Sequence, residues 1–493
     1  MLRNTVFFIF LVSGIITINN ACKSHFRVYN DCENHFLSGC CTLGKIFVCS
    51  VVNLTNSNDF AKEIPKTISV LTVANIKTSF INNGDWKFLS NLTNLMELSF
   101  INNRMSILYD LKSVYLNDLD KLKLLSFALG DLRIFPVEKF KNLSSLRYLD
   151  LHCNQLQSVG DGHWNFSVLN ELILSNNRLT AVRAGQLKGL ENLSKLDLSY
   201  NRISYFSMKV LDAMPMLTYL SLSFNRLGHI SDSSQQHSNL YFLGLSCNLF
   251  VGLEPLVFNG LKSFHSVDYY NNTIKYPPSG NSKNTVSLAL ALSLSSNVIE
   301  VLSPHYFDNF PHLNRIKVEN NNIRHIEETT FRSVHNVTSI DMSLNQIHSI
   351  PRKLFQHLQK LVIVELQFNR IQTFHPFLFN HLAPHLQLFA DDNPIVCDCQ
   401  ALPLLMWLSD SEMSLENFPR CQSPKEVQSQ SIYYVKLLSD CPHSTRMPSS
   451  TYVTPPSYTS PPRDHGTLSL TLAACAFVMI LICSLSLCLC IVG

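Results

Sequence analysis

One pattern of leucine residues recurs through most of the chain and restricts what the chain can fold into. In the copy that spans residues 193–203, leucines at the first, fourth and sixth positions precede an asparagine at the ninth and an isoleucine at the eleventh. From Asn154 onward the asparagine returns at intervals of 23 to 25 residues. The asparagine column consists of Asn103, Asn154, Asn177, Asn201, Asn225, Asn248, Asn272, Asn297, Asn321, Asn345, Asn369 and Asn393. A unit this short cannot enclose a core of its own, so neighbouring copies must stack and share one.

The spacing of the leucines predicts the local structure. Leucines two residues apart place their side chains on one face of a short strand, which can pair with the same strand of the next copy. The asparagine amide can bond buried backbone groups where the chain turns away from the strand. Apolar residues such as Phe307 and Phe310 in the second half of the copies suit a short helical turn and belong to the core. The sequence therefore predicts an α/β solenoid with a parallel sheet on its concave side.

We count fourteen copies, which gives a repeat region over residues 68–392 that ends at the entry into a C-terminal cysteine segment. Two copies are irregular. One carries Gly130 in place of the asparagine, so its ladder of contacts should be interrupted. The copy around Asn272 continues into Tyr276, Pro277 and Pro278, which predicts a local kink or a protruding loop.

Cysteines gather at both ends of the repeats, as expected for disulfide-bonded caps in an oxidising compartment. The first cap spans residues 22–67 and carries Cys22, Cys32, Cys40, Cys41 and Cys49; the second spans residues 393–441 and carries Cys397, Cys399, Cys421 and Cys441. Four cysteines allow three connectivities, and a zinc site is the competing interpretation of the second set. Cys153 and Cys247 share one strand position but lie too many repeats apart to bridge.

The two ends of the chain indicate the secretory pathway and a membrane attachment. Residues 1–21 have the layout of a signal peptide, and residues 442–466 form a spacer rich in serine, threonine and proline. The uncharged apolar tail over residues 467–493 is either a signal for a glycosylphosphatidylinositol anchor, with Ser457 and Asp464 as candidate attachment residues, or a transmembrane helix. The absence of basic residues after Arg463 favours the lipid anchor. No cytoplasmic signalling domain is expected.

Asn-x-Ser/Thr sequons support an extracellular or lumenal location. They lie at Asn53, Asn91, Asn142, Asn165, Asn192, Asn271 and Asn336. Most precede their strands by a few residues, whereas Asn271 is placed at a strand end, so we expect N-glycans to leave the concave face mostly bare.

The chain over residues 22–441 resembles the extracellular leucine-rich-repeat family, including Toll-like receptor ectodomains and surface proteins of the chaoptin and connectin type. The most specific match is the C-terminal cap: Asn393, Pro394, Cys397, Asp398, Cys399, Trp407, Leu408, Cys421, Ser423, Pro424 and Cys441. The resemblance implies a leucine-rich-repeat horseshoe with disulfide-bonded N- and C-terminal caps, and pairing of Cys397 with Cys421 and of Cys399 with Cys441. The N-terminal cap departs from the family pattern in having five cysteines, so its pairing stays open.

Variable positions of the strands should face outward on the concave side, and aromatic residues occupy several of them. The candidate ligand-binding residues are Tyr148, Tyr200, Tyr219, Phe224, Tyr241, Phe242 and Tyr270. Exposed aromatics on adjacent strands are typical of interface centres, although such rings could instead cover neighbouring loops. An acidic column stands beside them, at Asp150, Asp197, Asp268, Asp341 and Glu365. Aspartate is usual at this position in the family pattern, which favours a structural role for the column.

The sequence favours binding over catalysis. With 39 basic and 36 acidic side chains it gives no charge signature for nucleic acid. No metal spacing, nucleophile motif or phosphate-binding loop is present, so we expect neither cofactor nor metal and no enzyme activity. We expect a protein on the extracellular side of the cell membrane that binds a protein or glycan ligand. Acting through a signalling partner, it would be an innate-immune-type receptor or co-receptor; the alternatives are a lipid-anchored adhesion molecule and a truncated single-pass receptor.

Overall fold

The computed structural model describes most of the repeat region and parts of both caps. The described residues are 33–34, 40–50, 62, 64–74, 86–101, 116, 118–231, 239–253, 261, 263–277, 288–375, 378, 386–398, 401 and 419–432. The chain divides into two compact units. Unit 1 comprises residues 1–156 and 162–173, and unit 2 comprises residues 157–161 and 174–493.

Unit 1 begins with an antiparallel edge and continues as a parallel sheet. Its strands are β1 (Glu33–Asn34), β2 (Cys40–Leu43), β3 (Ile46–Ser50), β4 (Val70–Ala74), β5 (Glu97–Ile101), β6 (Leu124–Ser126), β7 (Tyr148–Asp150) and β8 (Glu171–Ile173), and its 3-10 helices are η1 (Trp86–Asn91) and η3 (Val137–Lys139). β1, β2 and β3 pair antiparallel. From β3 to β8 each strand pairs in parallel with the next, as expected for stacked copies of one unit.

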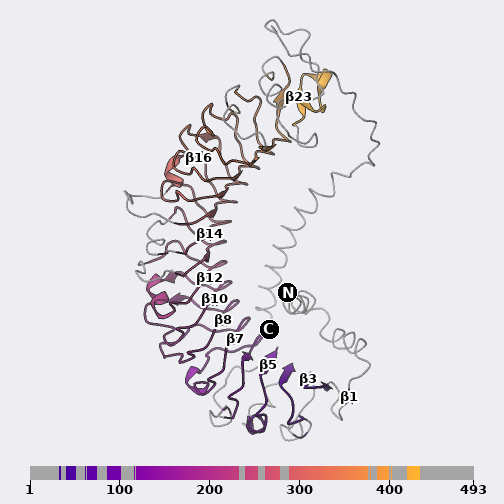
Figure 1. Cartoon of the computed structure of the whole chain (residues 1–493), viewed down its shortest axis with the longest axis vertical. Coiled ribbons are helices and arrows are strands. Elements are labelled where there is room, and N and C mark those ends of the chain that lie inside the picture. Colours follow the sequence, from indigo (N-terminus) through magenta and orange to yellow (C-terminus); the bar gives the residue numbers. More distant parts are fainter. Residues whose placement is uncertain are drawn as a thin grey trace. The chain divides into compact units, whose positions relative to one another are not determined.

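Unit 2 contains one parallel sheet with one strand from each repeat (Figure 1). Its strands are β10 (Lys195–Asp197), β12 (Tyr219–Ser221), β13 (Phe242–Gly244), β14 (Ser266–Asp268), β15 (Ala291–Ser293), β17 (Arg315–Lys317), β19 (Ser339–Asp341), β20 (Ile363–Glu365) and β21 (Gln387–Phe389). The far side carries the short strands β9 (Ala181–Val182), β11 (Tyr205–Phe206), β16 (Val301–Leu302) and β18 (His325–Ile326) and the 3-10 helices η4 (Met208–Ala213) and η6 (Pro304–Tyr306). The predicted parallel solenoid is therefore confirmed.

The asparagine column forms a ladder of side-chain hydrogen bonds between repeats. Asn321 accepts a hydrogen bond from the backbone N–H of Ile299 at 3.1 Å, and its Nδ2 donates to the carbonyls of Leu294 and Val318, both at 3.0 Å. Bonds of the same kind occur at Asn154 in unit 1 and, in unit 2, at Asn201, Asn225, Asn248, Asn272, Asn297, Asn345, Asn369 and Asn393. Each amide satisfies buried backbone groups of two consecutive repeats, as the sequence predicts.

The residue before each ladder position has a left-handed backbone. Its φ lies between +52° and +58° at Leu129, Cys153, Asn176, Tyr200, Phe224, Cys247, Asn271, Ser296, Asn320, Leu344, Phe368 and Asp392. This conformation strains residues other than glycine. A backbone hydrogen bond to the next repeat holds it, as from the N–H of Tyr200 to the carbonyl of Ser223 at 2.9 Å. Leu129 keeps it although Gly130 supplies no amide, so the irregular copy retains the turn without its side-chain contacts.

The core follows the repeat pattern. The leucines of the strands and the phenylalanines that the sequence assigns to the core, such as Phe307 and Phe310, are fully buried. Phe307 and Phe331, from successive repeats, lie 5.5 Å apart between ring centroids. Large apolar side chains thus fill the space between the sheet and the far side, and the stacking of repeats removes them from water.

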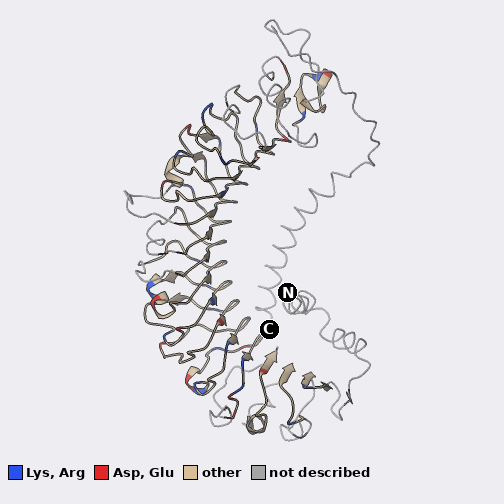
Figure 2. Ribbon diagram, viewed as in Figure 1, with Lys and Arg blue, Asp and Glu red and all other residues tan. Residues whose placement is uncertain are grey.

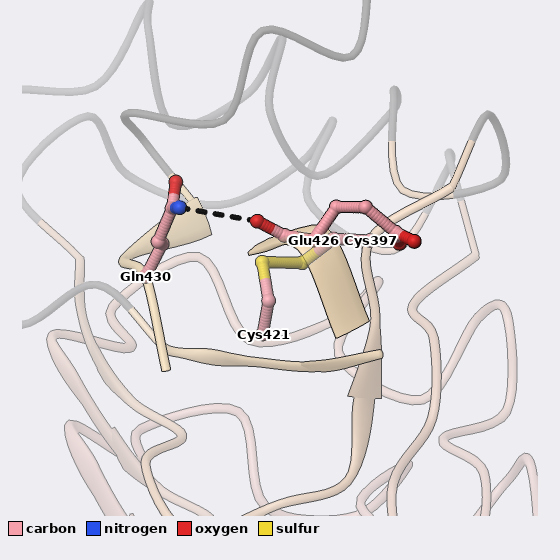
Figure 3. Close-up of a disulfide and its surroundings, with 4 residues drawn as sticks. All are labelled: Cys397, Cys421, Glu426 and Gln430. Atoms are coloured by element: carbon pink, nitrogen blue, oxygen red, sulfur yellow. Dashed lines mark hydrogen bonds between the residues drawn. A yellow bond between two sulfur atoms is a disulfide. The ribbon is translucent and has the colours of Figure 1, made fainter. Parts of the chain in front are cut away.

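In the C-terminal cap, Cys397 and Cys421 form a disulfide with a Cα–Cα distance of 5.6 Å, in agreement with the resemblance (Figure 3). Both cysteines are buried. Beside the bridge, β22 (Ile395–Val396) pairs with β23 (Cys421–Ser423), and η10 (Lys425–Val427) follows. Next to the disulfide the Nε2 of Gln430 donates to the carbonyl of Glu426 at 3.4 Å. Cys399 and Cys441, the other expected pair, lie outside the described residues.

The predicted terminal segments also lie outside the described residues. These are the signal peptide, the spacer with Ser457 and Asp464, and the apolar tail. Within the described ranges no helix has the length and apolar character needed to cross a membrane. In the N-terminal cap Cys49 is disulfide-bonded and buried, which agrees with a cap closed by disulfides.

Candidate ligand-binding surface

Six of the seven predicted aromatic residues lie in four consecutive repeats of unit 2. They are Tyr200, Tyr219, Phe224, Tyr241, Phe242 and Tyr270, in the repeats of β10, β12, β13 and β14. Tyr219 and Phe242 directly precede the buried Leu220 and Leu243 on their strands, so their side chains stand on the concave face. Tyr241 and Tyr270 are 50% and 42% exposed, and the other four rings are partly buried. We call these six residues, together with His265, the aromatic strip.

The rings of the aromatic strip stack on one another across neighbouring strands. Tyr200 and Phe224 lie 4.1 Å apart between centroids, and their planes are within 8° of parallel. Tyr219 and Phe242 stack at 4.8 Å. Tyr241 stacks at 4.5 Å on His265, which the sequence analysis did not select. Because the spacing of paired strands, about 4.8 Å, matches the distance between stacked rings, residues in register on adjacent strands can stack without distortion.

Tyr219 also interacts with two charged residues of β10, Lys195 and Asp197. The Nζ of Lys195 lies 5.7 Å from the centroid of the Tyr219 ring. Burial raises the pKa of the Tyr219 hydroxyl, and the carboxylate of Asp197 raises it further. The hydroxyl therefore stays protonated, and it offers a hydrogen-bond donor at neutral pH.

Gly244 leaves room for one of these stacks. A Cβ added there would lie 2.9 Å from the Oγ of Ser223 and 3.1 Å from the Cε1 of Phe242. The Phe242 ring therefore occupies space that a side chain at residue 244 would fill. Gly244 follows Phe242 on β13, and the sequence pattern offered no signal that it would matter.

Gly244→Ala is expected to displace the Phe242 ring from Tyr219, because the added methyl group overlaps the ring edge. We expect a loss of about 1–2 kcal/mol in the free energy of unfolding and a weaker near-UV circular dichroism signal. Gly228→Ala is the matched control, since the nearest atom to its Cβ would lie 3.8 Å away. Equal effects of the two substitutions would show that Gly244 does not support the stack.

Tyr148 is the seventh predicted residue and lies in unit 1, on β7. It is partly buried and is not part of the aromatic strip. The prediction treated all seven as one surface because their repeats follow each other in sequence. The candidate surface of unit 2 does not include Tyr148.

Most sequon asparagines are exposed and precede their strands. Asn91, Asn142, Asn165 and Asn192 are exposed, and Asn336 is partly buried and accepts a hydrogen bond from the Nζ of Lys360 at 2.7 Å. Asn271 is exposed at the concave edge beside Tyr270, and its Nδ2 donates to the Sγ of Cys247 at 3.3 Å. Asn53 lies outside the described residues. Glycosylation of these residues stays a prediction.

The acidic column is mainly structural. Asp197 accepts hydrogen bonds from the N–H of Ser199 at 2.9 Å and from its hydroxyl at 2.6 Å. Asp150, Asp268 and Asp341 likewise accept from the N–H two residues further on, at 3.0, 2.9 and 3.0 Å. These four aspartates hold the chain where it leaves the strand. Glu365 forms no such bond, so it departs from the column.

Acidic and basic residues are spread over the described chain (Figure 2), but carboxylates gather on the last strands of the sheet. Lys317, Asp341, Glu365 and Phe389 are in register on β17, β19, β20 and β21. Burial raises the pKa of Glu365, and the charge of Asp341 raises it further. Burial likewise raises the pKa of Glu319, whose carboxylate accepts a hydrogen bond from Ser295. The charged forms of Glu365 and Glu319 therefore lower the stability of the folded protein.

Glu365→Gln is expected to raise the melting temperature at pH 7. The pKa of Glu365 in the folded protein is raised above the ordinary 4.5, so the folded state binds the proton more tightly than the unfolded state. Stability therefore falls as the pH rises through the folded pKa, and above it the wild type carries the full cost of the charge. The gain from glutamine should shrink as the pH falls toward 4.5. A lower melting temperature at pH 7, or an equal gain at both pH values, would contradict this assignment.

Comparison with known proteins agrees with this architecture. The leucine rich repeat family model matches residues 167–227 and 291–347. Toll, in a structure of the Drosophila Toll–Spatzle complex described as a molecular hub in development and innate immunity, is similar with a TM-score of 0.50 and 15% identity. That match covers 80% of this chain and 72% of that one. A leucine-rich-repeat protein of Leptospira interrogans matches with a TM-score of 0.41 and 22% identity, over 66% of this chain and 92% of that one. No curated protein matches the sequence significantly.

The chain contains leucine-rich repeats in the two segments that the family model matches, and its fold is similar to that of Toll in the Toll–Spatzle complex. The repeats and the ladder asparagines that the sequence analysis identified are the features that define leucine-rich repeats.

Proposed function

We propose that the protein is a recognition protein that binds a protein ligand through the aromatic strip of unit 2. The observation that carries this proposal is the set of three stacked ring pairs in the repeats of β10, β12, β13 and β14. Stacked rings have little rotational freedom left to lose, so a ligand that covers them gains contact area at small entropic cost. Aromatic residues with polar tips are enriched at the centres of protein interfaces for this reason.

The polar groups of the strip suit a protein surface. The Tyr219 hydroxyl is a hydrogen-bond donor at neutral pH, and Tyr241 and Tyr270 present exposed rings. A repeat solenoid offers an extended surface for a protein partner and is not built around a catalytic pocket. Within the described residues no group of His, Cys, Asp or Glu could hold a metal ion.

We further propose that the protein acts on the extracellular side of a cell membrane as a receptor or co-receptor. The exposed sequon asparagines and the buried Cys397–Cys421 disulfide support an oxidising compartment. In the Toll–Spatzle complex, the fold that this chain resembles binds a protein. Attachment through the C-terminus, whether by a lipid anchor or a helix, is part of the proposal.

The test is a binding screen with the full-length protein on cultured cells, probed with a panel of purified secreted proteins from the source organism. A ligand should bind saturably to the wild type. Tyr241→Ala and Phe242→Ala should each weaken that binding at least about tenfold, because both rings lie in the stacked strip. Tyr276→Ala is the matched control, since its exposed tyrosine lies on the far side from the sheet.

Two results would contradict the proposal. The first is a ligand whose binding falls with Tyr276→Ala and is unchanged by the strip variants. The second is aggregation of expressing cells with each other, unchanged by the strip variants, which would favour an adhesion molecule that uses another face.

A further inference from the structure

A second cluster of exposed side chains lies on the concave side of unit 2, in the repeats of β19, β20 and β21. Leu344 and Phe368 are 49% and 50% exposed. They occupy the left-handed position before the ladder asparagine in consecutive repeats. Phe368 stacks on no other described ring, in contrast to Tyr200 and Phe224 at the same position of earlier repeats. The pair therefore presents apolar area to solvent that nothing described in the chain covers.

Carboxylates flank this apolar pair. Asp341 and Glu365 are in register on β19 and β20, and Asp391 lies two residues after the end of β21. Glu365 makes no hydrogen bond or ion pair with any described residue. The concave positions of these three repeats, which the structure describes, carry no lysine or arginine. Lys317 is in register beside Asp341. Burial and the charge of Asp392 raise the pKa of Asp391, and Arg420 lowers it by a smaller effect.

One buried polar atom without a hydrogen-bond partner in the described ranges lies between the carboxylates and the apolar pair in the sequence. The buried Oε1 of Gln367, between Glu365 and Phe368, accepts no hydrogen bond from the described residues. Phe389, in register with Glu365, adds a partly buried ring to the apolar part. We call Asp341, Leu344, Glu365, Phe368, Phe389 and Asp391 the acidic–apolar patch.

We propose that the acidic–apolar patch binds a segment of a protein partner in which lysine or arginine side chains alternate with large apolar ones. The inference rests on the proposed function and adds the chemistry of a second contact. Apolar side chains of such a segment cover Leu344 and Phe368, and its cations meet the carboxylates, where charge-assisted hydrogen bonds are strong. A metal ion is a poorer fit, because no described group of carboxylates is arranged to hold one.

The probe is a fluorescein-labelled twelve-residue peptide in which lysine alternates with leucine, titrated into the purified full-length protein and followed by fluorescence anisotropy. We expect saturable binding that weakens with added salt. Phe368→Ser, Leu344→Ser and Glu365→Gln should each weaken it at least about fivefold. A lysine–serine peptide and a glutamate–leucine peptide should bind at least about tenfold more weakly, because each lacks one half of the required chemistry.

Val301→Ser is the control variant, since Val301 is 45% exposed on the far side, on β16. Unchanged melting temperatures of Phe368→Ser and Leu344→Ser, and the raised one expected for Glu365→Gln at pH 7, separate lost binding from lost folding. Equal binding by the wild type, Phe368→Ser and Glu365→Gln would overturn the inference, as would equal binding of the lysine–serine peptide. Either result leaves recognition by the aromatic strip intact, because that proposal is tested by Tyr241→Ala and Phe242→Ala with a natural ligand.

Discussion

Asn321→Ser is expected to lower the free energy of unfolding by about 3 kcal/mol, because it removes the amide that bonds two repeats. The substitution leaves the buried N–H of Ile299 without its acceptor and the carbonyls of Leu294 and Val318 without their donor. Serine is too short to replace these bonds. Urea unfolding of the purified full-length protein, followed by circular dichroism, measures the loss.

The neighbouring Asn320→Ser is the matched control. The Asn320 side chain is exposed and donates only to the Oγ of Ser296, at 2.8 Å. Serine already occupies the equivalent left-handed position at Ser296, with φ +56°, so the backbone accepts it. A change within about 0.5 kcal/mol is expected for this surface substitution. Equal losses at residues 320 and 321 would contradict the role given to the ladder.

Replacing both Cys397 and Cys421 with serine is expected to cost about 3 kcal/mol, because the disulfide closes a loop of 24 residues. Both sites are buried, so the two hydroxyl groups must also be removed from water. The last repeats should then open first. Limited proteolysis of the full-length protein, with cut sites assigned by mass spectrometry, would show early cleavage after about residue 386.

Cys247→Ser provides the control for this loss. Cys247 lies in the repeat of β13, far from the cap in sequence, and its thiol accepts a hydrogen bond from the Nδ2 of Asn271 at 3.3 Å. Its replacement should leave the proteolysis pattern of the cap unchanged, which would separate loss of the bridge from loss of a thiol. Cleavage within the repeats of β12 and β13, with an intact cap, would show that the disulfide does not hold the end of the solenoid.

The backbone of the repeats could be predicted because the same leucine and asparagine positions recur in each copy. The leucines of residues 193–203 assign strand and core, and Asn201 makes the backbone bonds that its place in the pattern requires. The structural interpretation of the aspartates is also supported, because Asp197 and Asp341 hold their own turns. In each case the decisive contact lies within one repeat or between equivalent positions of two.

The binding surface was only partly predictable, because it depends on which side chains meet across strands. Tyr241 was selected as one of seven aromatic residues, whereas its stacking partner His265 is not an aromatic of the type that interface statistics favour. Gly244 matters through the side chain it lacks. Glu365 resembles the aspartates in position, but its side chain is longer by one methylene group and makes no turn bond. These differences arise between repeats, where the consensus pattern carries no information.

The left-handed residue before each ladder asparagine separates folding from recognition. Its backbone conformation is nearly the same for tyrosine at residue 200, cysteine at 247, serine at 296 and aspartate at 392. The same turn therefore accepts side chains of different size and chemistry, of which Asp392 is exposed and the other three are partly buried. The solenoid thus holds a row of interchangeable sites in which evolution can alter specificity one repeat at a time without redesigning the scaffold.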